Sequence, residues 1–160
     1  MTRIMDATLV LHGEHTINAS TFTAMVTSST LANASQVVAS AIGSLSGPLH
    51  GGANEKVIAM LQKIESKEEI RPWLDETLKA KNVVWGMGHR EYSVKDPRAN
   101  ILTDMVQQLF DEREGGVTDI FEKAIELEKA CEEKLSHKGV YPNVDFYSGI
   151  LYKEMDIPTD

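Results

Sequence analysis

Two histidines of this chain each lie in a glycine-rich break between helical patterns, where an imidazole could do chemistry. His50 belongs to the run GPLHGGAN at residues 47–54, and His89 follows Gly86 and Gly88 in the run GMGH. Glycine lets a backbone and a ligand approach each other closely where a side chain would block them. The chain has only five histidines, so two of them in such surroundings point to a function for their imidazoles.

The two histidines suggest different parts of a site. The pattern places His50 at the start of a helix, where the helix dipole disfavours imidazolium, and a neutral imidazole there can donate a hydrogen bond to a developing oxyanion. The alternative is a histidine that only caps its helix. The Gly-x-Gly turn before His89 exposes backbone groups to a ligand, although an ordinary tight turn has the same sequence.

An arginine and an aspartate are the candidate partners of these imidazoles. Arg98 follows the helix start Asp96-Pro97, where a cation opposes the dipole, so we expect an anionic partner such as a carboxylate. The alternative is a solvated surface arginine. Asp145 lies early in the last helical pattern with Tyr141, Phe146 and Tyr147 nearby. These aromatic residues would desolvate the carboxylate, raise its pKa and make it a better base; the alternative is a first-turn aspartate favoured by the dipole.

His12, Glu14 and His15 form a polar group after an apolar stretch. Two histidines three residues apart share one face of a helix, and this spacing also suits a pair of metal ligands. With no clear third ligand, metal binding is the weaker interpretation of this group.

Helical periodicity extends over almost the whole chain and predicts an all-α fold. The small side chains of residues 34–46 predict a buried helix that packs closely on a neighbour. Ser66 and Glu69 have the spacing of a capping box, and residues 82–88 favour an ordered loop over a short strand. The expected helices cover residues 4–13, 18–30, 34–46, 50–65, 66–81, 97–114, 118–138 and 143–157.

Composition narrows the functional classes. A chain of 160 residues with a formal charge of −8 can form one core and is not expected to bind nucleic acid in bulk. The single Cys131 excludes an internal disulfide and a thiolate metal cage, and it fits a reducing cytoplasm. We find no signal peptide and no stretch of about 20 apolar residues that would span a membrane. The abrupt helical start and the helix-stop signal at the end suggest a piece of a larger protein.

Four runs taken together resemble the citrate synthase family, which includes 2-methylcitrate synthase. They are LHGEH with NAS at residues 11–20, GPLHGGAN at 47–54, GMGHR through DPR at 86–98, and NVDFYSG at 143–149. Their order and rough spacing match the family over nearly the whole chain. The resemblance implies a partial citrate synthase fold. In it, residues 1–47 are large-domain helices at a dimer interface, 48–157 form the small catalytic domain, and 158–160 lead back to the large domain.

The resemblance also implies a reaction of the tricarboxylic acid cycle, in which acetyl-CoA and oxaloacetate give citrate and CoA. Asp145 would be the base and His50 the donor to the acetyl oxygen. His89 would polarise the oxaloacetate carbonyl, and His15 and Arg98 would bind oxaloacetate. Backbone groups of the loop would contact CoA; its residues are Val83, Val84, Gly86 and Gly88.

No metal or prosthetic group is expected, because the thioester itself activates the methyl carbon and acetyl-CoA is a co-substrate. The family is homodimeric, and neither nucleic acid nor membrane is an expected partner. Many bacterial members carry a lysine at the position of Ser93, so this chain loses a charge that suits a CoA phosphate unless Lys95 replaces it. We expect the isolated chain to be inactive. The alternatives are a propionyl-CoA substrate or a non-catalytic helical dimerisation or regulatory module.

Overall fold

The protein folds into helices joined by short loops. The computed structural model describes residues 2–13, 17–89, 93–112 and 116–158. Within those residues there is no β-strand, only an isolated bridge between Met87 and Pro142. The α-helices are α1 (Thr2–Gly13), α2 (Ala19–Ser29), α3 (Ala34–Leu45), α4 (Ala53–Gln62), α5 (Ile70–Lys79), α6 (Pro97–Asp111), α7 (Asp119–Leu135) and α8 (Val144–Glu154). Short 3₁₀ turns occupy Lys67–Glu69 and Ser136–Lys138. The all-α prediction is confirmed.

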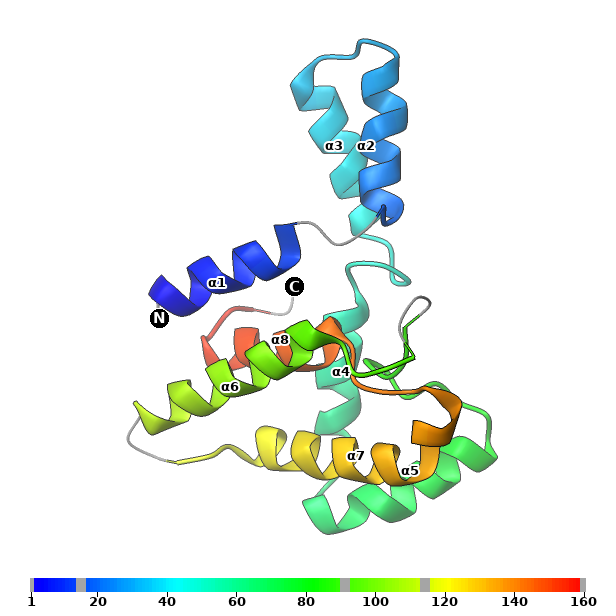
Figure 1. Cartoon of the computed structure of the whole chain (residues 1–160), viewed down its shortest axis with the longest axis vertical. Helices are drawn as coiled ribbons and strands as arrows, with labels where there is room; N and C mark the ends of the chain where they lie inside the picture. Colours follow the sequence, from blue (N-terminus) through cyan, green and yellow to red (C-terminus); the bar gives the residue numbers. More distant parts are fainter. Residues whose placement is uncertain (1, 14–16, 90–92, 113–115, 159–160) are drawn as a thin grey trace.

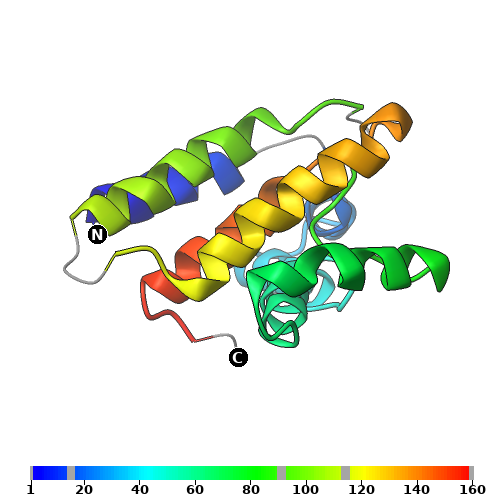
Figure 2. The ribbon, with the colours of Figure 1, turned by 90° about the horizontal axis from the view of Figure 1, so that it is seen from below.

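Helix α8 is the centre of the core. Six consecutive residues, from Phe146 to Leu151, are buried, so this helix is enclosed on all sides. It contacts α4 and α6, and α7 runs below it in Figure 1 and in front of it in Figure 2, which is seen from below. The catalytic candidate Asp145 therefore stands at the first turn of the most enclosed helix of the molecule.

Helices α2 and α3 form a hairpin that projects away from this core (Figure 1). The side chain of Asn18 accepts a hydrogen bond from the Thr21 amide at the start of α2, and Asn33 and Gln36 form a reciprocal capping box on α3. The small residues allow the two helices to pack on each other. However, no residue of either helix is buried, so the prediction that 34–46 is a buried helix is wrong. Close packing within a pair covers only one face of each helix.

The loop of residues 82–88 is ordered by backbone contacts rather than by strand pairing, as predicted. Gly86 and Gly88 adopt φ values of 78° and 87°, which favour glycine. The Gly88 amide donates to the Tyr141 carbonyl at 2.7 Å, and the Asn143 amide donates to the Gly86 carbonyl at 2.9 Å. The loop is thus fixed against the segment that begins α8.

Several expected helix limits differ from the structure. Helix α4 begins at Ala53, three residues after His50, because residues 47–52 form a series of tight turns. Ser66 makes no side-chain cap with Glu69, and a 3₁₀ turn precedes α5 instead of a capping box. The expected helix over 118–138 ends as α7 at Leu135 and continues as a 3₁₀ turn over Ser136–Lys138. The break expected at Gly115 lies outside the described residues.

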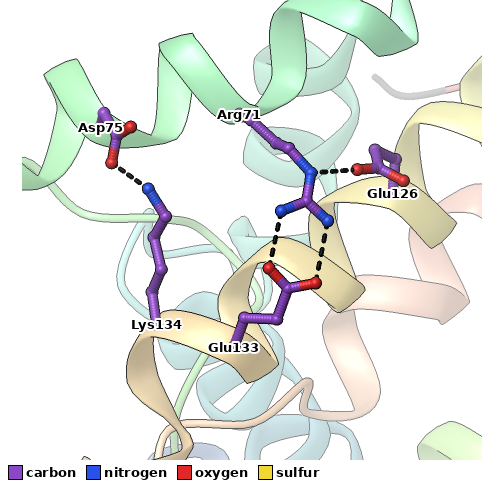
Figure 3. Close-up of polar contacts among 5 residues, drawn as sticks. All are labelled: Arg71, Asp75, Glu126, Glu133 and Lys134. Atoms are coloured by element: carbon purple, nitrogen blue, oxygen red, sulfur yellow. Dashed lines mark hydrogen bonds and ion pairs between the residues drawn. The ribbon is translucent and has the colours of Figure 1, made fainter.

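Charged side chains join α5 to α7 on the surface (Figure 3). The guanidinium of Arg71 contacts both carboxylate oxygens of Glu133, at 2.6 and 2.9 Å, and Glu126 at 2.7 Å. Lys134 pairs with Asp75 beside this cluster. These groups are exposed enough for water and salt to screen them, so the cluster sets the alignment of the two helices more than it adds stability.

Among the helices of the described residues, none combines the length and the apolar composition that a membrane span needs.

Candidate functional site

A cleft of about 1190 Å³ lies where the hairpin meets the core. Its walls come from the end of α1, the start of α2, the end of α3 with its following turns, and the first turns of α4, α6 and α8. It brings together four predicted site residues that are far apart in the sequence: His50, His89, Arg98 and Asp145. His12 lines the same cleft. The predicted ligand His15, and Glu14 beside it, lie outside the described residues.

His50 is held by the turns between α3 and α4, not by a helix start as predicted. Its amide donates to the Gly47 carbonyl at 2.9 Å, and the Gly51 amide donates to the Leu45 carbonyl at 2.8 Å. A Cβ on Gly51 would lie 2.5 Å from that carbonyl oxygen, so only glycine fits there. The glycine run after His50 is therefore required by the turn that presents the imidazole.

Ser20, at the start of α2, fixes the ring of His50. The Ser20 amide donates to His50 Nε2 at 3.3 Å, and the Ser20 hydroxyl lies 2.9 Å from the same nitrogen. Because the amide can only donate, this contact selects the tautomer with a bare Nε2 and a proton on Nδ1. The neutral imidazole then has one N–H available as a donor, which agrees with the predicted role. Ser20 is 30 residues away, and no local signal revealed it.

Asp145 sits in the first turn of α8. Its amide donates to the side chain of Asn143, the N-cap of the helix, at 3.0 Å. Burial raises the pKa of the Asp145 carboxyl, whereas the positive potential of His12, Arg98, His50 and His89 lowers it less. The net upward shift is the one expected for a general base in a partly closed site. Desolvation therefore outweighs the favourable charges, as the aromatic surroundings predicted.

Arg98 is not the solvated arginine of the alternative interpretation. Its side chain is 13% exposed, and it lies against the Asp96 side chain, which is 1% exposed. Arg98 Nε is 3.1 Å from Asp96 Oδ1, and Nη2 is 2.7 Å from Oδ2. Asp96 also caps α6 by accepting from the Arg98 amide. This fork holds the guanidinium rigidly and leaves Nη1 for an anion in the cleft.

His12 is a cleft residue that sequence reasoning considered only as a metal ligand. Its Nδ1 donates to the Thr8 carbonyl at 2.8 Å, one helical turn earlier in α1. A carbonyl can only accept, so Nδ1 carries a proton. Within the described residues, no group of three or more His, Cys, Asp or Glu side chains is placed to hold a metal ion.

The start of α8 is fixed by a second set of contacts that the sequence did not reveal. The buried Tyr147 donates its hydroxyl to Glu128 of α7, and Lys95 pairs with the same carboxylate at 2.5 Å. Glu128 neutralises the charge of Lys95 in this ion pair. Lys95 therefore does not replace the lysine that many family members carry at the position of Ser93. On the opposite side, the Asn54 amide donates to the Ser148 hydroxyl at 2.9 Å. Asp145 is thus aligned by α4 and α7 together.

The residues predicted to contact CoA do not line this cleft. Gly86 packs on the core beside Phe146, Val84 is 7% exposed, and Gly88 faces Val140. Val83 is 64% exposed. The CoA contact of this loop stays a prediction, as does the domain boundary at residue 47.

Known proteins match the chain along its whole length. The family described as "Citrate synthase, C-terminal domain" matches residues 1–160. Citrate synthase from Synechocystis sp. is 54% identical over 158 residues, covering 99% of this chain and 39% of the relative. That from Acidithiobacillus ferridurans is 49% identical, covering 99% and 41%. The chain therefore spans about two fifths of the length of these curated relatives.

Solved structures agree. Citrate synthase from Pyrobaculum aerophilum superposes with a TM-score of 0.91 at 35% identity, covering 99% of this chain and 39% of that one. The enzyme from Thermoplasma acidophilum, solved as a ternary complex with carboxymethyl coenzyme A and oxaloacetate, gives a TM-score of 0.88 at 34% identity, covering 98% and 41%. By its sequence, its helices and the cleft they form, this chain belongs to the citrate synthase family.

Proposed function

We propose that the chain is the catalytic part of an enzyme that condenses acetyl-CoA with oxaloacetate to give citrate and CoA. One observation carries the proposal: a half-buried carboxylate with a raised pKa shares a cleft with two imidazoles and a fixed guanidinium. The ternary complex of the Thermoplasma relative supports these substrates. The reaction needs this combination, because a methyl group beside a thioester loses a proton only if a base and an oxyanion donor act together.

Each group has one task in this proposal. Asp145 takes a proton from the acetyl methyl group, and the N–H of His50 stabilises the developing enolate oxygen. His89 donates to the oxaloacetate carbonyl and makes its carbon electrophilic. Arg98, held by Asp96, offers its remaining N–H groups to a substrate carboxylate. The new carbon–carbon bond forms between the acetyl methyl carbon and that carbonyl carbon, and water then cleaves the thioester. No resident metal or prosthetic group is required.

A chimaera tests the proposal. These 160 residues would replace the matching segment of the Synechocystis enzyme, to which they are 54% identical. We expect the chimaera to form citrate from acetyl-CoA and oxaloacetate, and the isolated chain to form none. Propionyl-CoA in the same assay tests the 2-methylcitrate alternative. A folded chimaera without activity toward either thioester would contradict the proposal and favour a non-catalytic module.

The contact between Ser20 and His50 gives a prediction within this mechanism. Ser20→Ala keeps the backbone donor and removes the hydroxyl, so His50 loses part of its alignment. We expect kcat of the chimaera to fall about three- to tenfold, the effect of one neutral hydrogen bond, with little change in the KM for oxaloacetate. Ser29→Ala is the matched control, because its hydroxyl donates only to the Val26 carbonyl of its own helix. Equal kcat values for the two variants would contradict this role.

We also propose that the α2–α3 hairpin packs against a second copy in a homodimer. Apolar side chains remain exposed on both helices; they include Phe22 (60%), Met25 (51%), Val38 (56%) and Ile42 (59%). An isolated hairpin with such faces is expected to seek a partner. The Asp145 and His50 cleft borders the hairpin, so dimer formation would also stiffen one wall of the site. Light scattering gives the mass of the chimaera with Phe22→Glu, and we expect a monomer. A variant that remained dimeric with the charged side chain would contradict the proposed interface.

The reducing cytoplasm remains the proposed compartment.

A further inference from the structure

The carboxylate of Glu128, on α7, joins the two segments that carry the proposed base and the proposed oxaloacetate ligand. The hydroxyl of Tyr147 in α8 donates to its Oε2, and Lys95 Nζ lies 2.5 Å from its Oε1. Tyr147 is two residues after Asp145, and Lys95 is three residues before Arg98. Glu128 does not line the cleft, so the condensation as proposed gives it no direct contact with a substrate.

The three side chains of this contact hold one another in place. Tyr147 is fully buried, and the side chain of Glu128 is 14% exposed. A buried hydroxyl that loses its acceptor is destabilising, so Tyr147 stays directed at Glu128. Lys95 Nζ also lies 5.8 Å from the centroid of the Tyr147 ring, within the range of a cation–π contact. Lys95 and Tyr147 are therefore fixed relative to each other as well as to α7.

Short stretches of backbone connect both partners of Glu128 to site residues. Asp96, the neighbour of Lys95, holds the guanidinium of Arg98 through two contacts, at 3.1 and 2.7 Å. A shift of Lys95 would therefore move the fork that presents Arg98. Tyr147 follows Asp145 within the first turn of α8. A shift of Tyr147 would therefore turn that end of the helix and redirect the base.

Another glutamate of the same helix provides a comparison. Glu126 lies two residues before Glu128, and residues at this spacing do not share a helix face. Its carboxylate binds Arg71 of α5 at 2.7 Å, as Figure 3 shows, and its side chain is 27% exposed. Glu126 thus has the same charge, the same helix and an ion pair of its own, but no connection to the cleft.

We propose that Glu128 is a positioning residue for the condensation. Its two carboxylate oxygens set the base on α8 relative to the guanidinium that binds oxaloacetate, one through Tyr147 and the other through Lys95. The inference rests on the proposed function and adds a residue that acts through others. Loss of the Tyr147 contact should act on kcat through Asp145, and loss of the Lys95 contact on the KM for oxaloacetate through Arg98.

Two variants of Glu128 in the chimaera separate its two contacts. Glu128→Gln keeps an oxygen that accepts from the Tyr147 hydroxyl and removes the ion pair with Lys95. We expect its KM for oxaloacetate to rise about three- to tenfold with kcat nearly unchanged. Glu128→Leu removes both contacts, so kcat should also fall, by about tenfold or more. Tyr147→Phe should lower kcat alone, and Lys95→Gln should raise this KM alone.

Glu126→Gln and Glu126→Leu are the matched controls, and both should keep kcat and KM within about twofold of the parent chimaera. A purely structural Glu128 would lower the Tm of its variants without separating kcat from KM. Glu128→Gln and Lys95→Gln leave Tyr147 with an acceptor, so they decide the question even if Glu128→Leu does not fold.

The inference is overturned if the Glu128 variants match the Glu126 variants in both constants, or if Glu128→Gln changes kcat as much as it changes KM. Either result in an active parent chimaera contradicts the positioning role and leaves the proposed condensation intact. An inactive parent chimaera contradicts the condensation itself, and this inference with it.

Discussion

Replacing Asp145 by alanine should lower citrate formation by the chimaera at least about a hundredfold, the usual contribution of a positioned general base. The loss should appear in kcat, because oxaloacetate would be held by Arg98 and the imidazoles rather than by this carboxylate. Asp104→Asn is the control, since that exposed carboxylate on α6 lies outside the cleft. A variant at Asp145 that retained even a tenth of the rate would require another base.

The pH dependence of the parent chimaera should report the same group. Asp145 acts as a base only when ionised, and burial raises its pKa. We therefore expect kcat to rise with pH along an acid limb centred above the pH at which an ordinary aspartate ionises. An acid limb at or below that pH would show that the neighbouring positive charges, not burial, determine the pKa of the Asp145 carboxyl.

Stability separates the two interpretations of Asp145. A carboxyl whose pKa is raised in the folded state binds its proton more tightly there than in the unfolded chain. Stability therefore falls as pH rises from the unfolded pKa through the folded one, and the deficit persists at neutral pH. Asp145→Asn removes this deficit, so at neutral pH its Tm should exceed that of the parent chain, and the difference should vanish at low pH. A first-turn aspartate favoured by the helix dipole predicts the opposite sign.

What could be read from the sequence was local. Three helix starts were predictable near their true positions, because a cap acts within three residues of itself, and in the structure Asn18, Asp96 and Asn143 each cap the helix expected to begin there. Two other local expectations are wrong, the capping box of Ser66 with Glu69 and a helix start at His50. The expectation of a buried helix over 34–46 is wrong because burial depends on what lies opposite. The small residues of α3 indicate close packing, but they cannot say that α2 alone supplies it and that the outer face stays bare.

Four residues of the cleft, His50, His89, Arg98 and Asp145, could be selected from the sequence, but the groups that support them could not. His50 and His89 stand out because glycine surrounds them, and Asp145 because aromatic residues do. The groups that fix them come from distant elements: Ser20 from α2, Glu128 from α7 and Asn54 from α4. A serine, a glutamate and an asparagine on helices have no local signature, so only the fold reveals them. The pairing of Arg98 with Asp96 spans two residues, yet the capping role of Asp96 concealed it.

The largest expected loss of stability is at Gly86. Its φ of 78° disfavours any side chain, and an added Cβ would lie 2.8 Å from Phe146 Cβ and Cδ2 and from Val57 Cγ2. Phe146 and Val57 are fully buried, so neither can move away easily. Backbone strain and overpacking together should reduce the free energy of unfolding of Gly86→Ala by about 2–5 kcal/mol, measured by urea unfolding of this chain.

Two other glycines separate strain from crowding. Gly116 has a φ of 73° with no atom within 4 Å of the added Cβ, and Gly88 has a φ of 87° with only Val140 at 3.8 Å. Their alanine variants should lose about 1–2 kcal/mol from strain alone, so the excess at Gly86 measures the crowding. The Gly86 carbonyl accepts from Asn143, whose side chain in turn accepts from the Asp145 amide. Crowding at Gly86 should therefore displace the start of α8 and lower kcat of the chimaera more than Gly116→Ala does. Equal losses of stability in Gly86→Ala and Gly116→Ala would mean that the core yields to the extra methyl group. Equal losses of kcat would mean that the loop does not hold Asp145 in place.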